Sequence, residues 1–194
     1  MSTTGPDRTR DGAEGAPTKE KRGIARFVPS LDAMGNFIRE SWDRLEGLPG
    51  GKRIFSGMVG LAAPYTATIG AHVVELSRGH AKVTMKDRRG LRNHLSSIHA
   101  IALVNLAELT GNVALAYSLP DDGRFIVAGL SIEYIKKARG TITATSESPI
   151  PPSSARAEFD VPVTLTDASG EVVARATLRT LVGPKRAPAR ADVN

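Results

Sequence analysis

One long apolar segment, residues 93–117, constrains the fold of this chain more than any other feature. It reads NHLSSIHAIALVNLAELTGNVALAY, and from Ser97 onward Ala, Leu and Val occupy nearly every side of a helical wheel. A helix that is apolar all round is either enclosed by the fold or spans a membrane. Because the uninterrupted apolar run is shorter than the roughly 20 residues that a bilayer requires, we expect a helix wrapped by a sheet. Ser96 or Ser97 is the expected N-cap, and Gly111 predicts close packing within the helix.

Three polar residues interrupt this helix. Asn105, Glu108 and Asn112 fall on one face at about 100° per residue. Burying a carboxylate is costly unless it is paired or functional, so we interpret Glu108 as a catalytic acid whose pKa is raised by burial. The alternatives are a hydrogen-bonded structural acid or a helix face that lies at the surface.

Composition restricts the class of protein and its partners. The 194 residues are 41% hydrophobic, which fits one globular domain, and no cysteine is present for disulfides, thiol nucleophiles or metal binding. This composition fits a cytoplasmic protein. The net charge of +6 favours an anionic partner, although much of the excess lies in the two tails.

The domain is predicted to span residues 27–183, between a disordered arm (1–26) and a basic flexible tail (184–194). The arm has no apolar region typical of a secretory signal. Apolar residues at helical spacing predict an additional N-terminal helix over Ser30–Leu45, within 30–46, and a helical turn over Phe55–Leu61.

Six strand-like runs surround the apolar helix in the sequence. Two of them precede the helix and four follow it, an order that predicts an α+β fold in which one antiparallel sheet curls round one long helix. The predicted strands are Ile69–Leu76, His80–Met85, Arg124–Ala138, Thr141–Ser146, Ala157–Thr166 and Glu171–Leu181.

Within this order, Asn93, His99 and Glu108 have a spacing that resembles the hotdog-fold acyl-CoA thioesterases, in particular the PaaI-like branch and its uncharacterised relatives. The resemblance covers the core, about residues 64–182, and Tyr134 also matches the pattern. It implies hydrolysis of an acyl-CoA, with coenzyme A as part of the substrate and neither a cofactor nor a metal. It also implies a homodimer that shares two active sites, possibly a tetramer.

Two departures from the family pattern concern the reaction itself. Ala100 replaces the glycine that follows the family's histidine, which narrows the approach to the thioester oxygen. Some relatives carry a Ser or Thr on the next strand to orient water, but Val127 and Ala128 stand there, and Thr110 or Ser131 is a weak substitute.

Thioester hydrolysis requires a base or nucleophile and a donor for the developing oxyanion. Glu108 is the expected base or nucleophile, and the first helix N–H groups, at His99 and Ala100, polarise the carbonyl. Asn93 holds the water or the thioester. The alternatives are that His99 is a capping residue and Asn93 a turn residue.

The remaining predicted contacts concern the body of the substrate. Basic residues either meet the phosphates of coenzyme A or are solvated surface charge, and no aromatics are interleaved for nucleic-acid binding. We predict no stable membrane insertion. The predicted substrate-binding residues are Ala100, Asn105, Tyr134, Lys136, Lys137 and Arg139, and Arg88, Arg89 and Arg92 are further candidates.

His99 and Glu108 lie nine residues apart, about 900° on a helix, and therefore point to opposite sides. Two chains can bring them into one pocket, which favours a homodimer with shared sites. Two other functions stay open. One is a hotdog hydratase or dehydratase, since His94 precedes Glu108 by fourteen residues, and the other is a non-catalytic acyl-CoA or lipid-binding protein.

Overall fold

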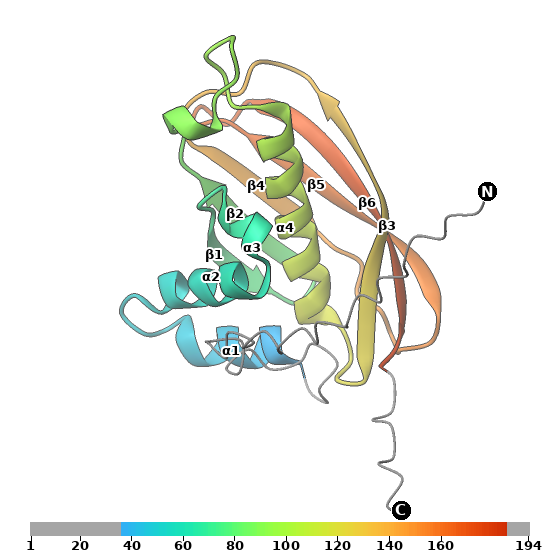
Figure 1. The fold of residues 1–194 in the computed structure, drawn as a ribbon. Coiled ribbons are helices and arrows are strands. Elements are labelled where there is room, and N and C mark those ends of the chain that lie inside the picture. The colour runs from blue at the N-terminus through green and yellow to red at the C-terminus, as the bar shows by residue number, and fades with distance from the viewer. Residues whose placement is uncertain (1–35, 186–194) are drawn as a thin grey trace, which may run out of the picture.

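Six antiparallel strands form one strongly curved sheet in the computed structural model, which describes residues 36–185 (Figure 1). The strand order is β1-β2-β4-β5-β6-β3, so β1 and β3 are the two edges. The strands are β1 (His72–Ser77), β2 (His80–Met85), β3 (Gly123–Tyr134), β4 (Ile142–Glu147), β5 (Ala157–Thr166) and β6 (Val172–Pro184). The predicted order along the chain, two strands before the long helix and four after it, and the antiparallel sheet are therefore confirmed.

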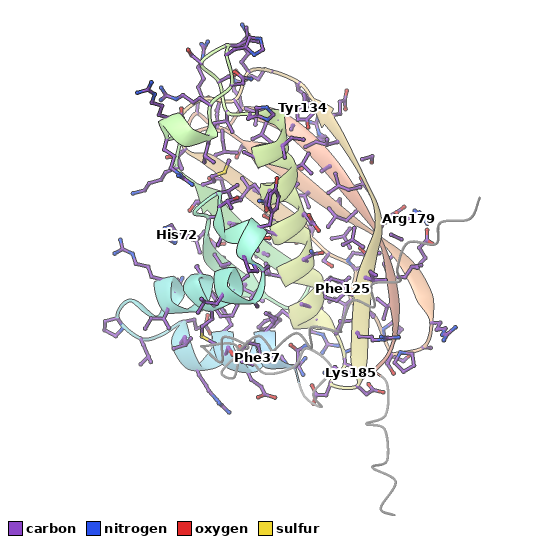
Figure 2. All side chains as sticks on the ribbon, in the orientation of Figure 1. Phe37, His72, Phe125, Tyr134, Arg179 and Lys185 are labelled. Atoms are coloured by element: carbon purple, nitrogen blue, oxygen red, sulfur yellow. The ribbon has the colours of Figure 1, made fainter. Side chains whose placement is uncertain are left out.

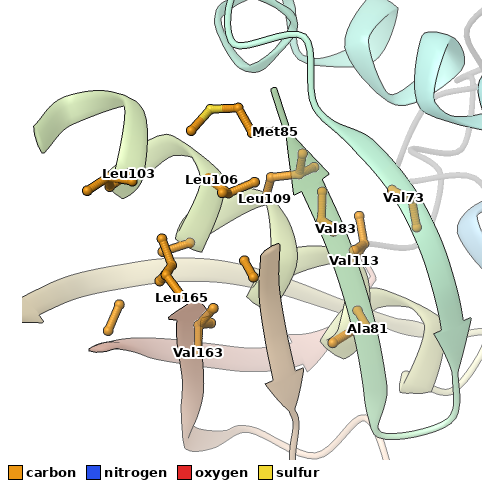
Figure 3. Close-up of a cluster of buried hydrophobic side chains, with 14 of the residues drawn as sticks. Val73, Ala81, Val83, Met85, Leu103, Leu106, Leu109, Val113, Val163 and Leu165 are labelled. Carbon is orange, nitrogen blue, oxygen red and sulfur yellow. The ribbon is translucent and has the colours of Figure 1, made fainter. Parts of the chain in front are cut away.

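The long helix α4 (Ala100–Ser118) lies in the concave face of this sheet, as the sequence predicts. Its sheet-facing side is packed against inward-pointing residues of β2 and β5 (Figure 3). Leu106 and Ala114 of the helix are fully buried, and so are Val83 and Leu165 of the strands. Burial of this aliphatic core, at about 25 cal/mol per Å² of apolar surface, supplies the main driving force for the fold.

Gly111 permits the close approach between α4 and the sheet. A Cβ atom at this position would lie 2.9 Å from Leu178 Cδ2 and 3.3 Å from Val161 Cγ1. Both neighbours are fully buried side chains of the sheet, so a larger residue would displace the core. The predicted close packing at Gly111 is confirmed.

Three helices precede the sheet: α1 (Phe37–Leu45), α2 (Gly51–Ala62) and α3 (Pro64–Ala67). The predicted N-terminal helix is confirmed from Phe37 onward, and the predicted residues 30–35 lie outside the described residues. The helical turn predicted over Phe55–Leu61 is a complete helix. Trp42 of α1 and Phe55 of α2 fix the pair through an edge-on ring contact, with centroids 5.1 Å apart.

The start of α1 is attached to the end of α4 by polar contacts. Asn36 Nδ2 donates to the carbonyls of Ala116 (2.7 Å) and Leu119 (3.1 Å), while its Oδ1 accepts the N–H of Arg39. The guanidinium of Arg39 donates to the Leu119 carbonyl and pairs with Asp121. These donors satisfy carbonyls that a helix end leaves without intrahelical partners.

We expect Asn36→Ser to keep the N-cap of α1 but to lose the donors to α4, because the serine side chain is too short to reach them. The free energy of unfolding should fall by about 1–2 kcal/mol, and Asn36→Ala should cost about 1 kcal/mol more. Urea unfolding followed by circular dichroism measures both. Equal stability of Asn36→Ser and wild type would show that the hydrogen bonds from Asn36 Nδ2 to α4 contribute nothing.

Candidate functional site

One stripe of α4 faces away from the sheet. Ile101 is 51% exposed, Val104 and Asn112 are partly exposed, and Glu108 is exposed. The prediction that one chain buries Glu108 is therefore wrong. The reason is that the curled sheet covers only the opposite side of the helix, so the polar face lies at the surface of the single chain.

The first residue of the helix is Ala100, not Ser97 as predicted, and the N-cap is His99 rather than Ser96 or Ser97. His99 Nδ1 accepts the backbone N–H of Ile101 at 3.1 Å. This hydrogen bond satisfies one of the free donors of the first turn and requires the unprotonated Nδ1. Capping, the alternative interpretation of His99, is confirmed.

The backbone N–H groups at the start of α4 are not equally available. The His99 N–H donates to the Leu91 carbonyl at 2.7 Å, which corrects its predicted role in polarising a carbonyl. The Ile101 N–H is taken by the cap. Within the described part of the chain, the Ala100 N–H has no acceptor. It lies at the positive end of the helix dipole, where an anion or an oxyanion is stabilised.

Asn93 organises the loop before α4. Its Oδ1 accepts the N–H of Leu95 at 2.9 Å and the hydroxyl of Ser97 at 3.2 Å. Asn93 is therefore a turn residue, which was the alternative interpretation, and it is partly buried. Ser96 in this turn adopts a left-handed φ of 54°.

Asp87 connects the same loop to the loop between β3 and β4. Its carboxylate accepts Arg92 Nε at 2.8 Å and the Gly140 N–H at 3.1 Å. The hydrogen bond from Arg92 is the main reason why the pKa of Asp87 lies below its ordinary value. The ionised Asp87 carboxylate therefore stabilises the fold at pH values above its unfolded-state pKa. This stabilisation is lost as the pH falls through the folded-state pKa.

Two predicted substrate-binding residues make contacts within the chain. Asn105 is buried, and its Nδ2 donates to the Tyr65 carbonyl of α3 at 3.3 Å. Tyr134 lies at the end of β3 beside the first turn of α4, and its hydroxyl donates to the Ala100 carbonyl at 3.4 Å (Figure 2). Partial burial raises the pKa of Tyr134. Asn105 thus connects α4 to α3, and Tyr134 connects β3 to the start of α4.

Some of the residues predicted to contact phosphate already have partners within the chain, and others are exposed. Lys136 forms ion pairs with Asp167 (2.7 Å) and with Glu171, so its ammonium group is already occupied. Lys137 and Arg139 are exposed, and no side-chain partner is seen for them among residues 36–185. Of the further candidates, Arg92 pairs with Asp87, Arg88 donates to the Thr68 carbonyl, and Arg89 is exposed.

The two hydroxyls considered as substitutes for a water-orienting residue have different surroundings. Thr110 is fully buried and donates to the Leu106 carbonyl at 2.7 Å. Ser131 is exposed on β3 and stands opposite Thr177 of β6. Thr110 therefore does not orient water at the Glu108 face, and the role of Ser131 stays a prediction.

A single chain does not bring the predicted catalytic residues together. Glu108 lies about 13 Å along the axis from His99 and on the other side of the helix, at 1.5 Å per residue. The surface depression described on the sheet lies elsewhere and is lined by residues 131–133 and 175–177. Among residues 36–185, no group of three His, Asp or Glu side chains is arranged to hold a metal ion.

α4 is the one helix of the described chain that is long and apolar enough to cross a membrane. In its most apolar window 61% of the residues are buried inside the fold, as expected for the core helix of a sheet-wrapped domain.

A curved antiparallel sheet wrapped round one long helix is the hotdog fold, which this chain shares with solved structures that include a probable thioesterase. Residues 51–182 match the family model "Domain of unknown function (DUF4442)", and the chain belongs to this family. No curated protein matches the chain.

Three solved structures illustrate the likeness. The structural-genomics protein APC5556 is 33% identical with a TM-score of 0.67, over 76% of this chain and 99% of that one. PA5026 from Pseudomonas aeruginosa, described as a probable thioesterase, is 23% identical with a TM-score of 0.62, over 71% and 97%. The PaaI protein of the E. coli phenylacetic acid degradation operon is 16% identical with a TM-score of 0.55, over 68% and 91%. The last two establish likeness of fold.

Sequence reasoning missed the contribution of α3 to the surroundings of Glu108. The main-chain carbonyl of Tyr65 holds Asn105, one turn before Glu108, and carbonyl contacts leave no residue-type signal in a sequence. Pro64 at the first position of α3 was the available indication that a second short helix begins there.

We expect His99→Ala to lower the free energy of unfolding by about 1 kcal/mol, because the Ile101 N–H loses its acceptor. His99→Asn should retain wild-type stability, since asparagine is a good N-cap. Thermal and urea unfolding of the three proteins measure the effect. A His99→Ala variant as stable as wild type would contradict the capping role.

Proposed function

We propose that the protein is an acyl-CoA thioesterase that works as a homodimer with two shared active sites. The observation that carries this proposal is the position of Glu108. It is the only carboxylate on α4 and lies on the uncovered stripe of that helix, between Val104 and Asn112. A surface that combines Ile101 and Val104 with one carboxylate suits a substrate that combines a hydrophobic acyl group with a hydrolysable bond.

The dimer is supported by the open edge of the sheet. β3 is 12 residues long and pairs with β6 on one side only, which leaves the other edge free to pair with a second copy. Ile126 and Tyr134 on this strand are 66% and 46% exposed. Pairing of two β3 strands would continue the sheet and would place the stripe of one α4 near the second chain.

The reaction needs one group from each chain. Glu108 of one chain takes a proton from water as the water oxygen attacks the thioester carbonyl carbon. The Ala100 N–H of the second chain, at the positive end of its helix, stabilises the oxyanion. When the intermediate collapses, the carbon–sulfur bond breaks, and the thiolate of coenzyme A takes a proton from Glu108. Direct attack by the carboxylate is the alternative role for Glu108.

The predicted substrate contacts refine this picture. Lys137, Arg139 and Arg89 are exposed near the N-terminal end of α4, and their charge suits the phosphates of coenzyme A. Lys136 is a weaker candidate because two carboxylates already surround it. A non-catalytic acyl-CoA-binding protein is the second candidate. It is favoured by Ala100, which narrows the approach to the thioester oxygen where the family has glycine. The Tyr134 hydroxyl, which donates to the Ala100 carbonyl, lies at the same end of α4.

We expect Glu108→Gln to lower the rate of thiol release from acyl-CoA by 100-fold or more, roughly the contribution of a general base. Binding of the substrate should persist, because glutamine has nearly the same size and shape. A panel of acyl-CoA substrates with a thiol-reactive dye measures turnover, and calorimetry measures binding. Retained turnover would exclude Glu108 as base or nucleophile. Turnover absent from the wild type as well would favour the non-catalytic protein.

Ala100→Pro removes the proposed oxyanion donor with little disturbance. Ala100 is the first helical position, where proline is favoured, and His99 before it has φ −64° and ψ 139°, a conformation that proline permits. We expect unchanged or slightly higher thermal stability and a turnover that falls by about 10²–10³-fold. A stable variant with wild-type turnover would remove the Ala100 N–H from the mechanism.

Mixing the two inactive variants serves as the control for a shared site. A dimer of one Glu108→Gln chain and one Ala100→Pro chain contains one site with both native groups. With random pairing about half of the dimers are mixed, and each mixed dimer has one of its two sites intact. Co-expression should therefore restore about one quarter of the wild-type activity. If both groups act within one chain, co-expression restores nothing.

A further inference from the structure

A second apolar surface lies on α2 and α3. Ile54, Met58 and Leu61 recur at helical spacing on one face of α2, and Tyr65 follows on α3. We call these four residues the α2–α3 stripe. Ile54, Leu61 and Tyr65 are 56%, 65% and 68% exposed, and Met58 is partly exposed. The buried face of α2 is a different one and contains Phe55. This helix therefore exposes large apolar residues that its packing does not require.

The stripe has a fixed position relative to Glu108. Gly60 lets α3 fold back closely on α2, because a Cβ atom there would lie 3.2 Å from the Cβ of Ala67. The Tyr65 carbonyl accepts Asn105 Nδ2 of α4 at 3.3 Å. Asn105 precedes Glu108 by one helical turn and shares its face. The backbone at the Tyr65 end of the stripe is thus fixed about one helical turn from Glu108, while Ile54 lies at the far end.

α2 carries two basic residues, Lys52 and Arg53, and Arg53 is exposed about 100° round the helix from Ile54. Lys52 at the start of α2 turns its ammonium toward the Val74 carbonyl (2.6 Å) and lies over the ring of Trp42 at 5.6 Å. Its charge is therefore directed away from the stripe. An apolar strip that ends about one helical turn from a carboxylate is complementary to a molecule with a hydrophobic tail and one polar reactive end.

We propose that the α2–α3 stripe binds the hydrocarbon chain of the acyl group and selects acyl-CoA by chain length. This inference rests on the proposed function, because it takes the thioester to lie at Glu108. A second copy of the chain is a less suitable occupant. α2 packs on β1, at the opposite edge of the sheet from β3, so pairing through β3 leaves the stripe open (Figure 1).

The order of residues along the stripe predicts a graded effect. The acyl chain meets Tyr65 first, then Leu61, and reaches Ile54 only when it is long. Leu61 and Ile54 are seven residues apart, about 10 Å along the helix. Each additional methylene that is buried should strengthen binding up to about fourfold, which corresponds to the transfer free energy of one CH₂ group.

The test uses non-hydrolysable S-alkyl-CoA thioethers with butyl, octyl and dodecyl chains, whose affinity for the full chain is measured by calorimetry. We expect wild-type affinity to rise with chain length. Leu61→Ala should weaken octyl and dodecyl binding about tenfold and leave butyl binding unchanged. Ile54→Ala should weaken only the dodecyl compound. Leu181→Ala is the matched control, since Leu181 is 41% exposed on β6, away from the stripe.

Each outcome is decisive. The proposal is overturned if affinity rises with chain length in the Leu61→Ala and Ile54→Ala variants as steeply as in the wild type or in the Leu181→Ala control. A change in molecular mass by light scattering, in place of a change in affinity, shows that the stripe is an interface between copies and also overturns it. Length-dependent binding that the variants reduce supports the stripe even when the wild type releases no thiol, and that combination rejects only the thioesterase. Circular dichroism confirms that the variants are folded.

Discussion

The packing of α4 into the curved sheet is the interaction on which the rest of the structure depends. Leu106, Ala107 and Ala114 are completely buried against the strands, and Gly111 allows the helix to approach Leu178 closely. A helix enclosed on one side by six strands can present only its remaining stripe to other molecules. The fold therefore determines where chemistry is possible before any reactive residue is considered.

The two ends of α4 are satisfied by different parts of the chain. At the C-terminal end, Asn36 and Arg39 of the N-terminal segment donate to carbonyls that the helix leaves free. At the N-terminal end, His99 caps the Ile101 N–H, and the Ala100 N–H has no acceptor in the part of the chain that the structure describes. The helix is thus fixed at both ends, and its one available donor lies where the dipole favours negative charge.

The sequence was sufficient to predict the elements whose pattern is simple. β2 and β5 have the predicted bounds, because their apolar residues alternate, and α4 was evident from its continuous apolar composition. α2 was only partly predicted, because it contains three glycines and has apolar residues on two faces. The continuous apolar composition that revealed α4 did not decide which of its sides the sheet covers, and the exposure of Glu108 was one of the alternatives that its polar face left open. Capping by His99 was one of two interpretations, and the N-cap was predicted at Ser96 or Ser97 because serine is a stronger N-cap residue type.

The free edge of β3 and the α2–α3 stripe lie on opposite flanks of α4. β3 and β1 are opposite edges of one sheet, and α2 and α3 lie on the β1 side of α4 (Figure 1). A second chain that pairs with β3 approaches α4 from one flank, while the α2–α3 stripe stays accessible on the other. Glu108 lies between the two. A substrate can then meet a donor from the second chain at its reactive end and a hydrophobic surface of the first chain along its tail. The proposed dimer and the proposed acyl-binding stripe would therefore use different surfaces.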